Sequence, residues 1–232
     1  SKPIWLPKIY SIEDFITELS GLQTIDNLSL QFRLYEIFDS NRPKNNEDNF
    51  EQFLKWSQTI LYDFNEMDRY LVDPQALLTN LRDIKELEQW SLNSAELTPF
   101  QEKYVQFFAY LYDWYTTFKA SLLKDNLAYQ GLADSIVNLK HDFDEVWFVG
   151  LNALNKCEEK IIGHLKSIDV ARVFWDADNY YYKNKHHEAG DFLRNQKEIW
   201  SDVKFKGLGD YLKFEKEEFN VIGCPKNVAQ AK

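Results

Sequence analysis

The chain has 232 residues, of which 44% are hydrophobic and 16% aromatic, and its 37 acidic and 27 basic residues give a net charge of −10 at pH 7. A chain of this length and aromatic content can bury a full core, which excludes disorder for most of its length. The acidic balance excludes a protein that binds duplex DNA mainly through its own phosphate contacts, because such proteins are basic. Any nucleic-acid contact must therefore be local, or shared with parts not present.

The cysteines and the two ends of the chain bear on its setting. Cys157 and Cys224 are too few for a disulfide framework or a structural zinc site, which favours a reducing, cytoplasmic location. No apolar run approaches the roughly 18 residues of a membrane span. Residues 1–10 lack both a signal peptide's apolar stretch and an initiator Met, and residues 221–232 follow a strand-like run with no closing element. We expect both ends to be cut from a longer protein.

Residues 1–140 have a helical pattern, with one short extended segment near residues 5–9. Ser11 followed by Asp14 is an acidic variant of the capping box, and Gly21 stands where that helix would end. Residues 46–71 place apolar side chains at helical spacing, which predicts an amphipathic helix.

Three more helices are predicted in this half of the chain. One begins at Asp73 with Pro74 at its first position, and the next at Thr98 with Pro99 at its first position. The helix after Pro99 has aromatic residues on most of its circumference, which predicts packing on several sides. A shorter helix covers about residues 128–139.

The pattern changes at Glu145. Two continuous apolar runs, residues 146–151 and 170–175, flank a helical segment, which is typical of a parallel βαβ unit buried on both faces. A further helix over about residues 187–200 leads to a last apolar run at 219–224. The fold class we expect is α/β and predominantly helical, with a small parallel sheet and an all-helical subdomain.

No phosphate-binding loop of the form G-x-x-x-x-G-K-[ST] occurs, and the pair Gly207 and Gly209 lacks both the third glycine and the preceding strand. The segment "DADN" could hold a cation through Asp176 and Asp178, but Tyr180 and Tyr181 occupy the places where a calcium loop needs an oxygen ligand and glycine. Solvated turn carboxylates are the preferred interpretation. We expect no metal site and no cofactor in this chain.

The remaining reactive side chains also favour structural roles. His186 and His187 are neighbours and do not meet the spacing of zinc enzymes, so an exposed helix start is preferred. Cys157 stands beside two glutamates that would raise the pKa of its thiol, and Cys224 has no histidine partner in the sequence. The carboxylates at 142, 144 and 145 precede a strand, whereas α/β active sites lie at the carboxyl ends of strands. Solvated positions are expected there, and no self-contained catalytic set emerges.

The order of these segments resembles the core of superfamily 1 helicases of the UvrD/RecB kind. In those enzymes one strand ends in Asp-Glu, which hold magnesium, and a second leads into a motif G-D-x-x-Q-S-I-Y-x-F-R-G-A whose Gln senses the nucleotide and whose aromatics stack on single-stranded bases. Here Gly150 and Leu151 stand in place of Asp-Glu. In the second motif Asp176 is retained and Asn179 replaces the Gln.

The resemblance continues beyond these four positions. Tyr182 matches the motif's Tyr, and Lys185 takes the place of its Arg. The segment "LPKIYSIEDFITEL" resembles the strand and helix after the phosphate loop, and "LAYQGLADSIVNL" resembles a later L-D-F-x-x-L-L helix. The implied organisation is the start of a RecA-like core at 1–25, a helical 1B-like subdomain at 26–140, and further RecA-like core at 141–232.

A helicase fold without its magnesium carboxylates is most similar to the AddB-type subunit of bacterial helicase–nucleases. The resemblance implies a non-catalytic helicase-like segment of a protein that processes DNA ends in double-strand break repair, with a PD-(D/E)xK nuclease domain beyond residue 232. It implies DNA and an AddA-like helicase subunit as partners, and no membrane. Nucleic-acid contacts are expected at Tyr180, Tyr182, Lys183 and Lys185, because tyrosine rings stack on bases and lysines neutralise phosphates. The three tyrosines 180–182 cannot all face DNA.

Two other functions stay open. The chain could belong to a working ATPase whose phosphate loop lies upstream, with Asp176 or Asp178 as the only nearby replacement carboxylate. It could also be a protein-interaction module, supported by its acidic charge and by the aromatic-rich helix over residues 100–123.

Overall fold

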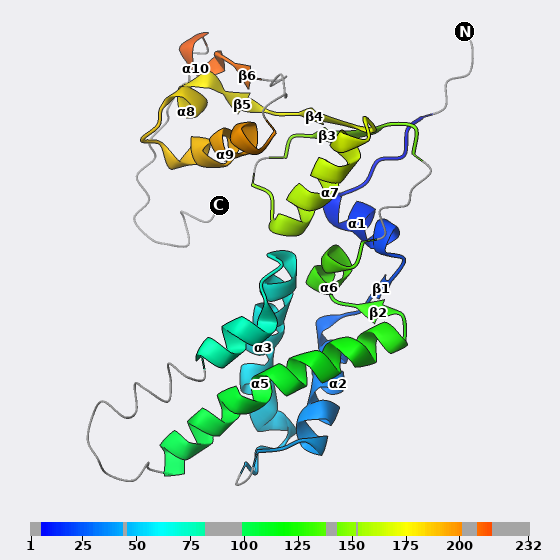
Figure 1. Cartoon of the computed structure of the whole chain (residues 1–232), viewed down its shortest axis with the longest axis vertical. Helices are drawn as coiled ribbons and strands as arrows, with labels where there is room; N and C mark the ends of the chain where they lie inside the picture. The colour runs from blue at the N-terminus through cyan, green and yellow to red at the C-terminus, as the bar shows by residue number, and fades with distance from the viewer. Residues whose placement is uncertain are drawn as a thin grey trace, which may run out of the picture. The chain divides into compact units, whose positions relative to one another are not determined.

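The computed structural model describes residues 6–43, 46–81, 99–137, 143–151, 153–200 and 208–214. The chain forms two compact units (Figure 1). Unit 1 comprises Ser1–Asp144 and Asn155–Asp169, and unit 2 comprises Glu145–Leu154 and Val170–Lys232. The described residues are mostly helical and contain small parallel two-stranded sheets, which confirms the predicted α/β, predominantly helical class.

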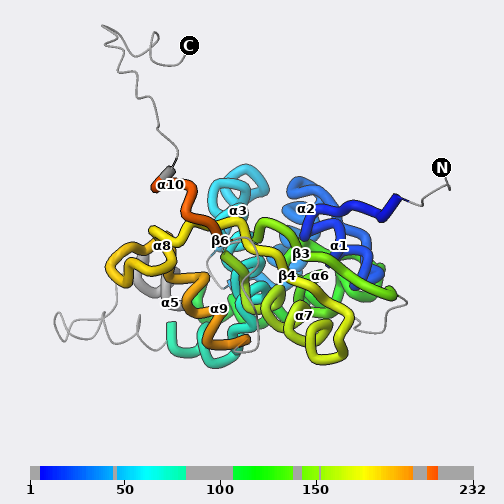
Figure 2. The backbone as a smooth tube through the Cα atoms, turned by 90° about the horizontal axis from the view of Figure 1, so that it is seen from above, coloured from blue at the N-terminus to red at the C-terminus, as the bar shows by residue number. Residues whose placement is uncertain are grey.

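In its described residues, unit 1 holds helices and one pair of very short strands. Its elements are α1 (Ile12–Ser20), β1 (Gln23–Thr24), α2 (Asn27–Ser40), α3 (Phe50–Arg69), a helical stretch over 74–81, α5 (Pro99–Lys124), β2 (Leu127–Ala128), α6 (Gln130–Ser135) and α7 (Lys156–Ser167). β1 and β2 pair in parallel. The chain therefore leaves this strand pair at the start of α2 and returns to it after α5. α1 lies beside α6 in both views (Figures 1 and 2).

The predicted helix ends of α1 are confirmed. The Ser11 side chain accepts a hydrogen bond from the Asp14 backbone N–H at 3.0 Å, and Gly21 ends the helix with φ of 68°. α3 begins at Phe50 rather than Asn46, because Asn49 and Gln52 form the capping box that fixes its start. Asp73 accepts hydrogen bonds from the N–H groups of Gln75 and Ala76, as expected of the residue before a helix.

α6 is shorter than the predicted helix over residues 128–139. Leu127 and Ala128 form strand β2 instead, and the Ala128 carbonyl accepts a hydrogen bond from the N–H of Ile25 at 3.1 Å. The helix therefore begins only at Gln130, and it ends at Ser135.

An aromatic core occupies the centre of unit 1. Phe38, Phe53 and Phe118 have no exposed surface, and Trp114 is 1% exposed. The ring centroids of Phe38 and Trp114 lie 5.3 Å apart in edge-to-face geometry, a favourable arrangement for aromatic pairs. α5 is thus packed as the aromatic pattern after Pro99 predicts, over the residues whose side chains are described.

Unit 2 contains the predicted parallel strand pair. Its elements are β3 (Val146–Val149), β4 (Ala171–Phe174), β5 (Ala177–Asp178), α8 (Asn179–Lys183), the short 3-10 helix η1 (Glu188–Gly190), α9 (Asp191–Ile199), β6 (Leu208–Gly209) and α10 (Tyr211–Phe214). β3 pairs with β4 in parallel, with Val146 opposite Ala171 and Val149 opposite Phe174. The predicted helix over 187–200 begins later, at Asp191, because η1 precedes it. The predicted strand at 219–224 lies outside the described residues.

The prediction that these strands are buried on both faces is wrong for β3. Phe148 is 5% exposed, whereas its neighbours Trp147 and Val149 are 63% and 66% exposed. Successive side chains of a strand point to opposite faces, so one face of β3 is covered and the other is open. Within the described ranges, no helix has the length and apolar character needed to span a membrane.

Candidate functional site

The carboxyl ends of β3 and β4 lie next to each other. The N–H of Gly150 donates a hydrogen bond to the carbonyl of Phe174 at 3.0 Å. Gly150 has φ of 73°, a left-handed conformation that glycine adopts without the steric cost of a Cβ atom. The position aligned with the magnesium-binding Asp of the resembled helicases is therefore a tight turn that disfavours a side chain, and Leu151 follows it.

The two aspartates after β4 have different surroundings. Asp176 is exposed, as predicted for a solvated turn, but that prediction is wrong for Asp178, which is 8% exposed. Its Oδ1 accepts from the N–H of Tyr180 at 2.7 Å, and its Oδ2 accepts from the N–H of Leu212 at 3.0 Å. These hydrogen bonds hold the pKa of Asp178 below its usual value.

Asp178 is therefore a structural carboxylate. It caps α8 and ties α10 to it, while β5 pairs with β6 through Ala177 opposite Leu208. No group of three or more potential metal ligands occurs among the residues that the structure describes. Gly209 lies within β6, and Gly207 lies outside the described residues.

The tyrosines of α8 differ in how open their rings are. Tyr180 is 56% exposed and meets the Tyr181 ring edge-on, with centroids 5.2 Å apart. Tyr181 in turn packs against His187, with centroids 4.7 Å apart. The Nζ atom of Lys197 lies 5.4 Å from the ring centroid of Tyr182, which is half-buried. Of the two tyrosines predicted to contact nucleic acid, Tyr180 is therefore more exposed than Tyr182. Asn179, which replaces the Gln of the resembled motif, begins α8 and is half-buried.

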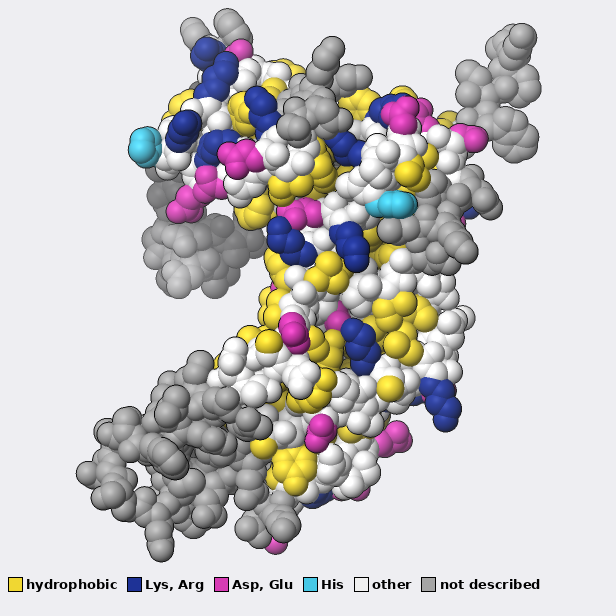
Figure 3. All heavy atoms as spheres, in the orientation of Figure 1, with side chains coloured by type: hydrophobic (Ala, Val, Ile, Leu, Met, Phe, Trp, Pro, Cys, Tyr) yellow, Lys and Arg dark blue, Asp and Glu magenta, His cyan; other side chains and the backbone are white. Residues whose placement is uncertain are grey.

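Basic side chains gather around these tyrosines. Lys183 and Lys185 are both exposed, and so is the neighbouring His186. Figure 3 shows Lys and Arg side chains collected over the part of unit 2 that holds α8 and α10. Unit 2 as a whole has 11 basic and 11 acidic residues, so the excess of acidic charge belongs entirely to unit 1.

The other reactive side chains show no catalytic arrangement within the described residues. Cys157 is 2% exposed and its Sγ contacts the Asp68 carbonyl at 3.3 Å; burial first, and nearby carboxylates second, raise the pKa of its thiol to about 12. The direction agrees with the prediction, although burial, and not the neighbouring glutamates, is the main cause. Asp144 and Glu145 are exposed, as predicted, and Glu145 pairs with Arg172 at 3.3 Å. Asp142 and Cys224 lie outside the described residues.

A buried polar cluster in unit 1 has no counterpart in the sequence predictions. The Asp68 carboxylate accepts hydrogen bonds from the hydroxyls of Tyr115 and Tyr129 and pairs with the ammonium group of Lys119. Arg69, the next residue, lies between two buried carboxylates. No periodicity reveals such a cluster, because its members come from α3, α5 and the segments around α6 and α7.

Comparison with known proteins adds no assignment: no protein-family model matches the chain, and no curated protein matches it. The resemblance to UvrD/RecB-type helicases therefore stays a prediction. Within the described residues, the side chains that this prediction singles out follow the carboxyl ends of β3 and β4 in the chain: Gly150 hydrogen-bonds to Phe174 at the end of β4, and α8 begins five residues later, at Asn179.

Proposed function

We propose that the chain is a non-catalytic helicase-like segment of a protein that processes DNA ends. In this proposal it has a RecA-like core with an inserted helical subdomain, and unit 2 supplies a contact for single-stranded DNA through Tyr180, Lys183 and Lys185. The observation that carries the proposal is the position of these exposed side chains on α8 and the loop after it, directly following the end of a parallel strand. Ligands of α/β folds bind at that edge of the sheet.

Two features support the helicase-like architecture. β3 and β4 are parallel neighbours joined through a segment that contains α7, which is the connection a RecA-like core requires. The parallel pairing of β1 with β2 brackets the helices α2, α3 and α5, as an insertion into such a core would need.

Two features support a motor without ATP chemistry. The turn at Gly150 and Leu151 offers no carboxylate for magnesium, and phosphoryl transfer depends on a positioned metal ion. Of the two replacement carboxylates that a working ATPase could use, Asp178 already accepts hydrogen bonds from two backbone N–H groups, and Asp176 is exposed.

The electrostatics of unit 2 support a local nucleic-acid contact. Exposed lysines beside an open tyrosine ring combine phosphate neutralisation with base stacking, each stacked base contributing about 1–3 kcal/mol in single-strand binding proteins. The acidic excess of unit 1 would oppose DNA, whereas the balanced charge of unit 2 would not.

The test is fluorescence anisotropy of a labelled duplex with a single-stranded tail, titrated with the protein at low and at physiological salt. We expect salt-sensitive binding that Lys183→Ala with Lys185→Ala weakens. Lys55→Ala with Lys160→Ala is the matched control, since both lysines are exposed on helices of unit 1 and their removal changes the net charge equally. If both double variants weakened DNA binding equally, the loss would follow from the change in net charge alone, which would contradict the proposal.

The second candidate function is a protein-interaction module. The exposed Trp147 and Val149 on one face of β3 favour it, because a large apolar side chain on an open sheet face is typical of a surface that another protein covers. Absence of DNA binding even at low salt would favour this function.

A further inference from the structure

We propose that Arg194 is the positioning residue of the candidate DNA contact: it fixes the segment 181–187 in the conformation that presents Lys183 and Lys185. This inference rests on the proposed function. It concerns a residue on a different element, α9, which has no place in the helicase motifs of the sequence analysis.

The guanidinium of Arg194 donates hydrogen bonds to four backbone carbonyls of the segment. Its Nη1 donates to the carbonyls of Tyr181 at 3.0 Å, Tyr182 at 3.2 Å and Asn184 at 3.0 Å. Its Nη2 donates to the carbonyl of His187 at 2.8 Å. One side chain thus ties both ends of the lysine-bearing segment to α9.

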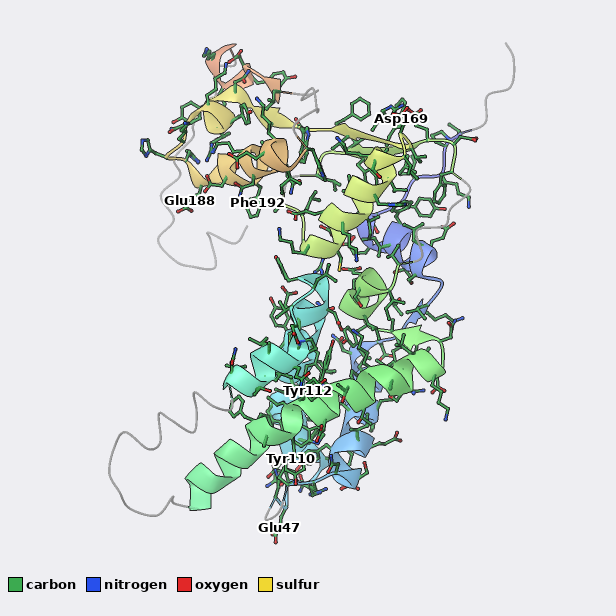
Figure 4. All side chains as sticks on the ribbon, viewed as in Figure 1. Glu47, Tyr110, Tyr112, Asp169, Glu188 and Phe192 are labelled. Atoms are coloured by element: carbon green, nitrogen blue, oxygen red, sulfur yellow. The ribbon has the colours of Figure 1, made fainter. Side chains whose placement is uncertain are left out.

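The position of the guanidinium is itself fixed. The Nη2 group pairs with Asp191, one turn earlier on α9, so the side chain is held on the side facing α8. Glu188 and Phe192 point away from α8 (Figure 4). A planar fork of five N–H donors can serve several acceptors at once, which the single ammonium group of a lysine cannot reproduce.

Gly190 makes room for this arrangement. A Cβ atom at this position would lie 2.2 Å from the carbonyl oxygen of Tyr181 and 2.3 Å from Nη1 of Arg194. Both distances are shorter than any real contact of that kind, so the backbone of Gly190 and the guanidinium approach the segment together. The hydrogen bonds of Arg194 to the segment therefore require glycine at position 190.

Arg194 is not placed to contact phosphate itself. Its side chain is 18% exposed, and both terminal nitrogens are engaged by backbone carbonyls and by Asp191. Lys183 and Lys185, by contrast, are exposed. Replacing Arg194 should therefore weaken binding without changing how many phosphates the protein neutralises.

That difference is measurable as a salt dependence. The slope of log K against log salt concentration falls by about 0.7 for each phosphate of a single strand that the protein no longer neutralises. We expect Lys183→Ala to reduce the slope by about this amount. We expect Arg194→Lys, which keeps the charge, to weaken binding about three- to tenfold at every salt concentration, because binding must then order a loosened segment, with the slope unchanged.

A second readout does not depend on DNA. Trypsin cleaves after lysine, so release of the segment should make cleavage after Lys183 and Lys185 faster in Arg194→Lys than in the wild type. Arg172→Lys is the matched control, since Arg172 is a 41% exposed arginine of β4 that pairs with Glu145. Amide hydrogen exchange in β3 and β4 reports whether unit 2 stays folded.

Each outcome decides the inference. Uniformly weaker binding with faster cleavage, while β3 and β4 keep wild-type exchange, supports positioning. Wild-type binding and cleavage in Arg194→Lys overturn it. A reduced salt slope with unchanged cleavage makes Arg194 a direct phosphate contact and also overturns it. Faster cleavage in a protein that binds no DNA overturns the proposed function and leaves only the structural anchor.

Discussion

The core of unit 1 and the α8 segment of unit 2 are stabilised by different kinds of interaction. Unit 1 is built on buried rings, with Phe38, Phe53 and Phe118 entirely inaccessible, and on carboxylates buried among hydroxyl and ammonium groups. In unit 2 the residues of α8 and its loop are held by two side chains, Asp178 and Arg194, that bind backbone groups. A close-packed core tolerates little change in the volume of its side chains. Side-chain hydrogen bonds to the backbone of a loop instead fix the conformation of that loop at the surface.

This difference separates the stability of the fold from the conformation of the segment that carries Lys183 and Lys185. A unit held by its aromatic core should lose folding free energy when a ring is removed. A surface segment held by side-chain hydrogen bonds should lose its conformation while the unit stays folded. Arg194→Lys tests the second expectation, and the core of unit 1 tests the first.

The largest effect is expected from Phe38→Ala. Removing a fully buried ring from a close-packed core leaves a cavity and should lower the free energy of unfolding by about 3–5 kcal/mol. Urea denaturation followed by near-UV circular dichroism measures it. Tyr62→Ala is the control, since Tyr62 is 64% exposed and its loss should cost under about 0.5 kcal/mol. Equal costs for the two variants would contradict an aromatic core as the main support of unit 1.

The next effect concerns the two buried carboxylates around Arg69. Oδ2 of Asp134 lies 3.3 Å from Nε of Arg69, and Oε1 of Glu158 lies 3.7 Å from its Nη2. Burial raises the pKa of both carboxyl groups above their usual values, in spite of the guanidinium between them. The folded protein then holds these protons more strongly than the unfolded chain does.

The sign of the pH dependence follows. A raised carboxyl pKa stabilises the fold fully below the unfolded pKa of about 4, and that contribution is lost as the pH rises through the folded pKa. Asp134→Asn should therefore remove a fall in unfolding free energy between about pH 4 and neutral pH. Asp26→Asn is the control of opposite sign, because hydrogen bonds from Ser29 lower the pKa of Asp26. The stabilisation by Asp26 is therefore present above its unfolded pKa of about 4 and is lost as the pH falls below it. Urea denaturation from acidic to neutral pH measures both effects. The assignment would be contradicted if Asp134→Asn left the curve above about pH 4 unchanged, or if Asp26→Asn altered it there.

A smaller gain is expected from Leu71→Gly. Leu71 follows α3 with φ of 52°, where the N–H groups of Leu71 and Val72 donate to the carbonyls of Asp68 and Met67. This is the helix ending that normally uses glycine, and Leu71 is 44% exposed, so little burial is lost. The free energy of unfolding should rise by about 0.5–1 kcal/mol in thermal or urea denaturation.

Leu123→Gly supplies the contrast to that gain. Leu123 is 36% exposed and lies within α5, where glycine weakens a helix by about 1 kcal/mol. Destabilisation by both glycine variants would show that the backbone at Leu71 carries no strain.

The left-handed conformation of Leu71 illustrates which features of the structure the sequence could not predict. The ends of α1 and the parallel pair β3–β4 were predictable, because Ser11, Gly21 and continuous apolar runs are local signals. Leu71 gives no such signal, since leucine rarely takes a left-handed conformation. Asp178 and Arg194 were equally unpredictable in role, because their partners are backbone groups of residues up to 34 positions away. The open face of β3 was missed since its apolar run does not reveal how many faces are covered.

The smallest expected effect is the failure of a restored motif. Gly150→Asp with Leu151→Glu would recreate the Asp-Glu pair of the resembled helicases, yet we expect no ATP hydrolysis above the wild type in a phosphate-release assay. The chain has no phosphate-binding loop to hold the nucleotide, and at a φ of 73° any side chain, including that of Asp, is less favourable than glycine. Turnover by this variant would mean that the chain binds nucleotide by another route, and it would overturn the proposed non-catalytic function. Its absence, together with DNA binding that depends on Lys183 and Lys185, would support the proposal that unit 2 contacts DNA through the surface around α8.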